Sequence, residues 1–357
     1  MRWPALDGLR ALAVLLVLYN HAPSLFGRGQ GAPGGVFHGS RGAWIGVDLF
    51  FVLSGFLITG ILLHGRDRPG ALGRFWKRRA LRIFPLAYVY LGALAALAWG
   101  TTAFVELRDP ASFGWATAYL LNLHLADVGW GAPALALLWS LAVEEQFYVL
   151  WPLLALRLGE RALVIALALA VAAAPFLRMA TLAGAGDVAA YVLPWCRMDA
   201  LAWGALLALG WRSPWQPRLA AAARWLALPA LGVVAWTIGG RIVPVGDGAT
   251  HGFVGFGFTA IAVAFAVLVA LALDPPRVVA GVLGAAPLRA IGKVSYGVYV
   301  WHVITAHVVG RALHAAWPTL PLWAYLAAWL LLLAGVTAAS WRWFEAPLLR
   351  LKERWAA

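Results

Sequence analysis

The stretch LDGLRALAVLLVLYNHA, residues 6–22, shows the pattern that decides the fold, a long apolar run with very few polar side chains. Such runs recur along the chain at about 17 to 25 residues, the length that a helix needs to cross a bilayer. They do not alternate apolar and polar residues with a period of two, as membrane-spanning strands do. The sequence therefore predicts an all-α, polytopic bundle of transmembrane helices.

The composition of the whole chain supports this prediction. Of its 357 residues, 63% are apolar and only 12% are charged, against about 25% charged in a typical soluble domain. A soluble fold of this size would have to expose much of that apolar surface to water. Many of the 21 tryptophans also stand near the ends of the runs, where aromatic side chains meet the membrane interfaces.

The apolar runs predict about ten spans within a single domain, residues 1–357. A shorter apolar piece at 113–125 is ambiguous, and we expect it to be re-entrant or interfacial. The ten spans are 8–26, 43–64, 84–104, 135–157, 161–182, 188–211, 220–239, 252–273, 288–311 and 321–342.

The distribution of positive charge predicts the orientation. With ten spans and a cytoplasmic N-terminus, most of the 28 Lys and Arg residues lie in cytoplasmic segments, whereas an eleventh span would move the later clusters outside. We therefore expect a multi-pass protein of the cell inner (plasma) membrane with both termini in the cytoplasm. The cations expected outside are Arg28, Arg41, Arg108, Arg178, Arg241 and Arg311.

The net charge of +13 does not indicate nucleic-acid binding, because it is spread over short segments between apolar runs. The predicted partner of these charges is the lipid bilayer. Cys196 is the single cysteine, so no internal disulfide can form. We expect no metal and no tightly bound cofactor.

Seven ionisable side chains lie well inside the expected spans, where each costs about 2.5–3.5 kcal/mol on insertion scales and indicates function. Because so many are hard to place against lipid, we expect them to line a shared polar interior. They are His21, Asp48, Glu144, Glu145, Arg197, Asp199 and His302.

Helical phase links His21 to Arg10. The two residues are eleven apart, close to three turns of about 3.6 residues, so they share a face at a separation of about 16 Å. A cation at the membrane edge and a titratable base at depth suit a ligand with an anionic head in the cytosol and a reactive group in the membrane. The alternative is that His21 forms only an interhelical hydrogen bond.

The stretch FWKRRALRIFP, residues 75–85, lies between the second and third expected spans. One interpretation is a positive-inside signal alone. The other is a site for the phosphates of a nucleotide-like donor. The predicted donor-binding cations are Arg10, Arg74, Lys77, Arg78, Arg79 and Arg82.

Further polar residues allow two interpretations each. Glu144 and Glu145 point about 100° apart on a helix, so only one of them can easily face a given site. The carboxylate expected to orient His21 is Glu144 in the first place and Asp48 in the second. A structural ion pair between Glu144 and Arg197 is the alternative. Arg197 and Asp199 are expected to serve different neighbours, and His302 is either a substrate ligand or a packed histidine. The predicted substrate-binding residues are Ser54, Glu145, Tyr148, Arg197, Asp199 and His302.

Seven motifs in order along nearly the whole chain resemble the acyltransferase-3 superfamily of membrane acyltransferases. They are LDGLRALAVLLVLYNHA (6–22), GVDLFFVLSGFLIT (46–59), FWKRRALRIFP (75–85), WSLAVEEQFYVLWP (139–152), CRMDALAWGALLA (196–208), IGKVSYGVYVWH (291–302) and WRWFEAPLLRLKER (341–354). The resemblance implies transfer of an acyl group, often acetyl, from cytoplasmic acyl-CoA to a hydroxyl group.

In this resemblance His21 matches the catalytic base, with Arg10 essential beside it and a covalent acyl-histidine as an alternative step. Asp48, Ser54, Glu144, Arg197, Asp199 and Glu345 match other motif positions. The expected acceptor is a polysaccharide, a lipid-linked sugar or a natural product. Many relatives carry an additional SGNH-type domain, which this sequence lacks, so we expect the chain to act alone or with a separate protein. A proton-coupled transporter or flippase is the rival function, because buried acids and histidines also form proton relays.

Overall fold

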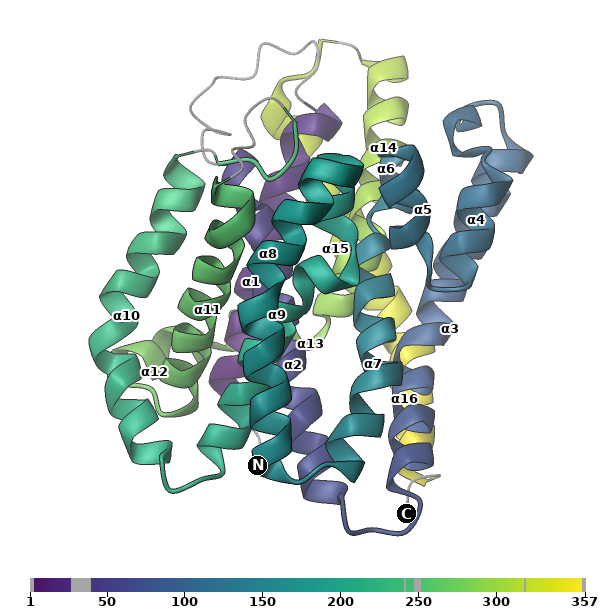
Figure 1. Ribbon diagram of the computed structural model, residues 1–357. Helices are drawn as coiled ribbons and strands as arrows, with labels where there is room; N and C mark the ends of the chain where they lie inside the picture. The colour runs from purple at the N-terminus through teal and green to yellow at the C-terminus, as the bar shows by residue number, and fades with distance from the viewer. Residues whose placement is uncertain (1–2, 27–39, 241, 247–251, 318, 355–357) are drawn as a thin grey trace.

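The computed structural model describes residues 3–26, 40–240, 242–246, 252–317 and 319–354. Over these residues the regular elements are all helical, which confirms the predicted all-α fold. The long helices run side by side as a bundle (Figure 1). Their bounds are α1 (Pro4–Phe26), α2 (Gly46–Gly65), α3 (Ala71–Gly100), α7 (Trp139–Arg157), α8 (Glu160–Val192), α9 (Pro194–Trp211), α10 (Gln216–Gly239), α11 (Phe258–Leu273), α14 (Ser295–Ala316) and α15 (Leu322–Ser340).

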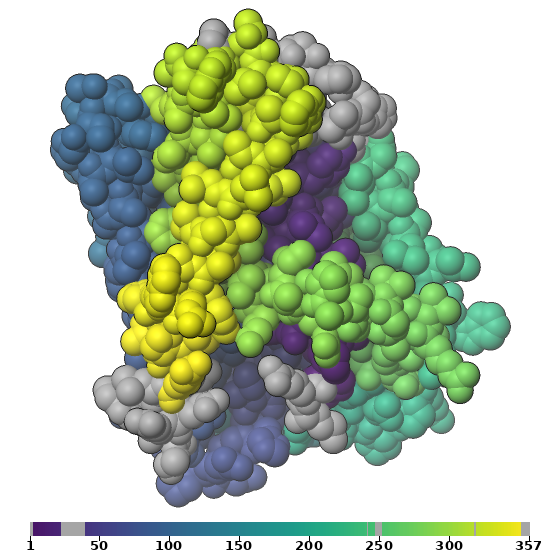
Figure 2. All heavy atoms as spheres, turned by 180° about the vertical axis from the view of Figure 1, so that it is seen from behind, coloured from purple at the N-terminus to yellow at the C-terminus, as the bar shows by residue number. Residues whose placement is uncertain are grey.

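Shorter helices connect these or extend them. They are α4 (Pro110–Thr117), α5 (Leu121–Val128), α6 (Pro133–Ala136), α12 (Arg277–Leu283), α13 (Ala286–Lys293) and α16 (Ala346–Arg354). Seen from behind, α1 is visible only in part between α12–α13 and the last helices (Figure 2). Two of the cations expected outside, Arg28 and Arg241, lie outside the described residues.

Seven stretches of the described chain are long and apolar enough to cross a bilayer, so the chain is a multi-pass membrane protein. The three other expected spans are also helices: α7, α9 and α14. These three carry most of the ionisable groups of the expected spans, which lowers their mean hydropathy, and the count of ten therefore stays a prediction. The seven stretches are Pro4–Ala22, Ser40–Gly65, Ala71–Gly100, Glu160–Val192, Gln216–Gly239, Phe253–Leu273 and Leu322–Arg350.

The ambiguous piece 113–125 falls in the two helices α4 and α5, each of 8 residues. A helix of this length spans only about 12 Å, well short of the hydrocarbon thickness. Neither helix crosses the membrane alone, as the charge bias predicts.

Two expected boundaries are wrong. The basic stretch 75–85 does not lie between helices, because α3 begins at Ala71 and continues through Pro85. With 30 residues, α3 is about 45 Å long and exceeds the hydrocarbon thickness of about 30 Å, so its basic first turns can extend beyond the apolar layer. Residues 188–192, expected to open the sixth span, instead end α8 after a break at Gly186, where φ is 85°.

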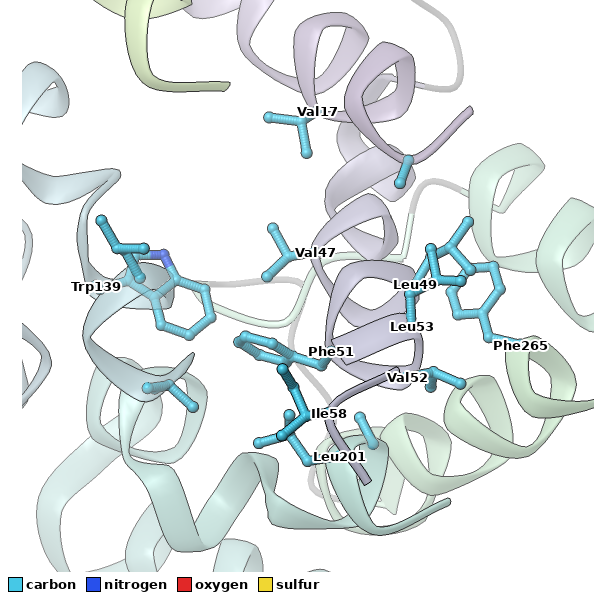
Figure 3. Close-up of a cluster of buried hydrophobic side chains, with 14 of the residues drawn as sticks. Val17, Val47, Leu49, Phe51, Val52, Leu53, Ile58, Trp139, Leu201 and Phe265 are labelled. Atoms are coloured by element: carbon cyan, nitrogen blue, oxygen red, sulfur yellow. The ribbon is translucent and has the colours of Figure 1, made fainter. Parts of the chain in front are cut away.

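Helix α2 lies at the centre of the bundle. Of its most apolar window, 72% is buried, against 17% for the window in α10. Figure 3 shows its apolar side chains pointing to several sides, toward Val17 of α1, Trp139 of α7, Leu201 of α9 and Phe265 of α11. A helix that is apolar all round is a buried helix, and α2 therefore positions the polar residues that it carries against four neighbours.

Glycines allow α2 and α9 to approach closely. A methyl group at Gly55 would lie 2.0 Å from the carbonyl oxygen of Leu201, and one at Gly204 would lie 2.0 Å from that of Val52. Small residues at both contacts bring the two backbones together, a common packing mode of membrane helices. The close contact holds Asp48 of α2 beside Arg197 of α9.

Candidate active site

A cavity of about 1480 Å³ opens at the end of the bundle where α1 begins and α16 ends. Of the three acidic residues in its lining, Asp7 is paired with Arg10 at 3.1 Å and Asp274 with Arg224 at 2.7 Å. The lining is therefore strongly positive and suits a polyanionic ligand. Its Lys and Arg residues are Arg10, Arg68, Arg74, Arg78, Arg82, Arg212, Lys293 and Arg350.

The first turns of α3 supply one face of this basic cavity. Arg74, Arg78 and Arg82 recur every four residues, so they share a side of the helix and all line the cavity. Lys77 and Arg79 lie to either side of that row. Lys77 is exposed and lines neither this cavity nor the smaller one described next, so the structure does not place it with the other predicted donor-binding cations.

A smaller cavity of about 100 Å³ adjoins the basic cavity, and Arg10, Arg82 and Tyr296 line both. Its polar wall is formed by Ser54, Glu144 and Tyr148. Ser54 Oγ donates to Glu144 Oε1 at 2.5 Å, and Tyr148 Oη donates to Ser54 Oγ at 3.2 Å.

The sixth predicted donor-binding cation, Arg79, also lines the smaller cavity, with its guanidinium 5.3 Å from the centre of the Tyr148 ring. The predicted residues Ser54, Glu144 and Tyr148 thus come together, with cations from both α1 and α3 beside them.

Glu145 is buried and lines neither cavity. Its Oε1 accepts no hydrogen bond from the described residues. Glu144 lines the smaller cavity and Glu145 does not, so the two side chains leave α7 in different directions, as predicted from the helix.

Asp48 and Arg197 form a buried ion pair, with Arg197 Nη2 2.8 Å from Asp48 Oδ1 and side-chain exposures of 2% and 0%. Four aromatic rings surround the guanidinium at 4.5–5.7 Å from their centres: Phe51, Trp139, Tyr191 and Phe258. Asp48 and Arg197 are therefore held by each other. The pairing of Glu144 with Arg197, considered above, does not occur.

Asp199 forms a second buried ion pair, with Arg178 of α8. Arg178 Nη1 and Nη2 lie 3.0 and 2.8 Å from the two carboxylate oxygens of Asp199. Thr259 Oγ1 also donates to Asp199 at 2.6 Å. Neither Arg197 nor Asp199 lines the two cavities, and each is instead held in a buried ion pair. As predicted, these two residues serve different neighbours.

His21 lies beside His302 of α14. Nε2 of His302 is 3.3 Å from Nδ1 of His21, and the ring centres are 4.9 Å apart. His302 also connects to the smaller cavity, because its Nδ1 lies 2.5 Å from the carbonyl oxygen of Tyr299, a residue of the cavity lining. Arg10 lines both cavities, whereas His21 and His302 line neither and lie deeper in the bundle.

The structure places neither predicted carboxylate, Glu144 or Asp48, in a hydrogen bond with His21. Among the residues described, the hydrogen bonds of Glu144 go to Ser54 and those of Asp48 go to Arg197. The imidazole at 3.3 Å is that of His302.

Three residues of this region were not predicted. Arg178 was counted among the cations expected outside, yet its side chain is completely buried; its position within the expected span 161–182 was the signal that could have found it. Tyr299 and Ser140 line the smaller cavity, and their hydroxyls lie 2.5 Å apart. Tyr299 stands three residues before His302 on the same helical face, a spacing that relates it to the histidine.

The comparisons with known proteins agree with the arrangement of the motifs. The chain is 30% identical over 320 residues to the peptidoglycan O-acetyltransferase OatA of Listeria monocytogenes, covering 84% of this chain and 48% of the relative. It is 28% identical over 366 residues to the O-acetyltransferase OatA of Staphylococcus aureus, covering 97% of this chain and 57% of the relative. The chain thus spans about half the length of these relatives, and no solved structure matches it. Residues 3–342 match the model of the acyltransferase-3 family, described as an acyltransferase domain, and the chain belongs to that family.

Proposed function

We propose that this chain is an O-acyltransferase that moves an acyl group, acetyl in the first instance, from cytoplasmic acyl-CoA to a hydroxyl group of a sugar or another hydroxylated acceptor. The observation that carries the proposal is the basic cavity, joined through Arg10 and Arg82 to a small polar cavity. The names of the relatives favour acetyl as the acyl group and a polysaccharide as the acceptor.

The charges of the basic cavity match the donor. Acyl-CoA carries its negative charge on phosphates at one end and its thioester at the other. Arg74, Arg78 and Arg82 on one face of α3 would hold the phosphates. A guanidinium group can donate two parallel hydrogen bonds to the oxygens of one phosphate. The thioester would then reach the smaller cavity, against Ser54, Glu144 and Tyr148.

His21 would act as the general base. Its Nε2 accepts the proton of the acceptor hydroxyl while that oxygen attacks the thioester carbon. The carbon–sulfur bond then breaks, and the sulfur of the leaving coenzyme A takes the proton. The products are the acyl ester and free coenzyme A. Arg10, ion-paired with Asp7, would stabilise negative charge at the donor end.

The orientation follows from the same site. The segments that line the basic cavity are those in which the positive-inside rule places cytoplasmic charge. We infer that this end of the bundle, with both termini, faces the cytoplasm of a cell inner membrane. A proton-coupled transporter is the second candidate, and the family assignment favours the enzyme.

The test supplies radiolabelled acetyl-CoA to the purified protein in liposomes and measures release of free coenzyme A and label in an added oligosaccharide acceptor. We expect both with the unchanged chain, and loss of both in His21→Ala with acetyl-CoA binding retained. Unchanged transfer in His21→Ala would refute the proposed base. Counterflow of a solute without thioester cleavage would support the transporter.

A further inference from the structure

The positions of the protons on the two histidines follow from their acceptors. A carbonyl oxygen can only accept a hydrogen bond, so His302 Nδ1, at 2.5 Å from Tyr299 O, carries a proton. In the neutral ring Nε2 of His302 then has a lone pair, and this lone pair faces His21.

The same reasoning applies to His21. Its Nδ1 lies 2.9 Å from the carbonyl oxygen of Val17, one helical turn earlier, and therefore carries a proton. This N–H meets two acceptors, Val17 O and His302 Nε2. The neutral ring of His21 consequently has its lone pair on Nε2, the nitrogen that a general base uses.

His302 is itself held firmly. It is completely buried, and Trp329 Nε1 of α15 donates to its carbonyl oxygen at 3.0 Å. The ring of Tyr299 stands 5.7 Å from the His302 ring on the side of the smaller cavity. The acceptor nitrogen of His302 therefore has a defined position opposite His21.

We propose that His302 is the positioning residue of His21: it fixes the tautomer with unprotonated Nε2 and accepts from Nδ1–H when His21 becomes an imidazolium. The inference rests on the proposed function. Orienting groups for catalytic histidines are commonly carboxylates, and here a neutral imidazole takes that place. A second buried charge, which is costly in an apolar interior, is thereby avoided.

Only one of the two imidazole rings, that of His21, is positively charged at any step of the reaction. A proton on Nε2 of His302 would point at the Nδ1–H of His21 and remove the hydrogen bond between the rings. His302 therefore stays neutral while His21 takes up and releases the proton of the acceptor hydroxyl.

The test compares His302→Phe, which keeps a ring without an acceptor, with His302→Gln, whose amide can accept from His21 and donate to Tyr299. His307→Gln on the same helix is the matched control. We expect kcat to fall by on the order of 10–100-fold in His302→Phe, the loss seen when groups that orient metal-bound histidines are removed. The KM for acetyl-CoA should stay constant, and His302→Gln should recover most of kcat.

Binding of acetyl-CoA, measured directly, serves as the check that each variant is folded. Wild-type kcat in folded His302→Phe overturns the proposal, as does a folded His302→Gln as inactive as His21→Ala. If His302→Phe does not fold, the result for His302→Gln decides: a folded variant as inactive as His21→Ala overturns the proposal. Transfer that survives His21→Ala instead refutes the proposed base, whatever the His302 variants do, so the two failures are distinguishable.

Discussion

Glu144 accepts a short hydrogen bond from Ser54 in the smaller cavity, whereas the adjacent Glu145 lines neither cavity. Ser54 also accepts from Tyr148, so the carboxylate of Glu144 fixes the direction of two hydroxyl groups. Hydrogen bonds to charged groups contribute about 1.5–3 kcal/mol, roughly twice those between neutral groups.

We therefore expect Glu144→Gln to lower kcat for acyl transfer by on the order of tenfold or more, since a neutral amide holds Ser54 less strongly. Glu145→Gln, the matched change one residue along, should have a much smaller effect. Initial rates of coenzyme A release at saturating acetyl-CoA measure both. Equal losses in the two variants would show that the small cavity has no special role.

At this scale helical phase predicted that Arg10 and His21 share a face and that the two glutamates diverge. It did not predict which side chains of different helices contact each other. Asp48 meets Arg197 and His21 meets His302 because α2 packs on α9 and α1 on α14, and a sequence read one helix at a time does not contain those contacts.

Among the elements, α3 combines a membrane-crossing part with a basic extension. The row Arg74, Arg78 and Arg82 faces the basic cavity, and Lys77 lies off it. The sequence located these basic residues correctly but assigned them to a connection between two spans, because proline is common in the first turn of a helix and Pro85 stands at the expected start of the third span. In a membrane helix an internal proline is tolerated.

Replacing Arg82 with Gln should raise the KM for acetyl-CoA by on the order of tenfold or more, since a charged hydrogen bond to phosphate is lost. Lys77→Gln removes the same charge from the same helix and should change KM little. Steady-state kinetics at two salt concentrations separate the effects, because a specific contact persists when general attraction is screened. A larger effect for Lys77→Gln would contradict the assignment of the phosphate site.

The contact of α2 with α9 predicts a difference in stability between two glycines of one helix. Gly55→Ala places a methyl group 2.0 Å from Leu201 O, whereas at Gly60 nothing lies within 4 Å. Overpacking costs about 1–3 kcal/mol, so we expect Gly55→Ala to lower the Tm in detergent and Gly60→Ala to leave it nearly unchanged. An unchanged Tm in both variants would mean that the helices separate freely.

At the scale of the whole molecule, the basic cavity gathers segments that are distant in sequence at one end of the bundle. The sequence predicted an all-α membrane protein from length and hydropathy alone. It could not establish the number of spans, because α7, α9 and α14 carry the polar interior and so resemble spans less than the lipid-facing helices do.

The orientation is testable by labelling introduced cysteines in intact cells. Cys196 is buried, so it contributes little background. We expect Thr102→Cys, exposed after α3, to react with a membrane-impermeant maleimide, and Asp67→Cys, exposed before α3, to react only after lysis. The reverse pattern would place the basic cavity outside the cell and remove acetyl-CoA as its ligand.

The ion pair between Asp48 and Arg197 also bears on how the protein is made. Its two members are 149 residues apart in the sequence. At a synthesis rate of about 5–20 residues per second, the ribosome adds Arg197 about 7–30 seconds after Asp48. During that interval α2 holds a carboxylate without its counter-ion at a site that excludes water in the finished fold. Because α9 supplies the counter-ion, we expect α2 to complete its contacts with its neighbours only late in translation.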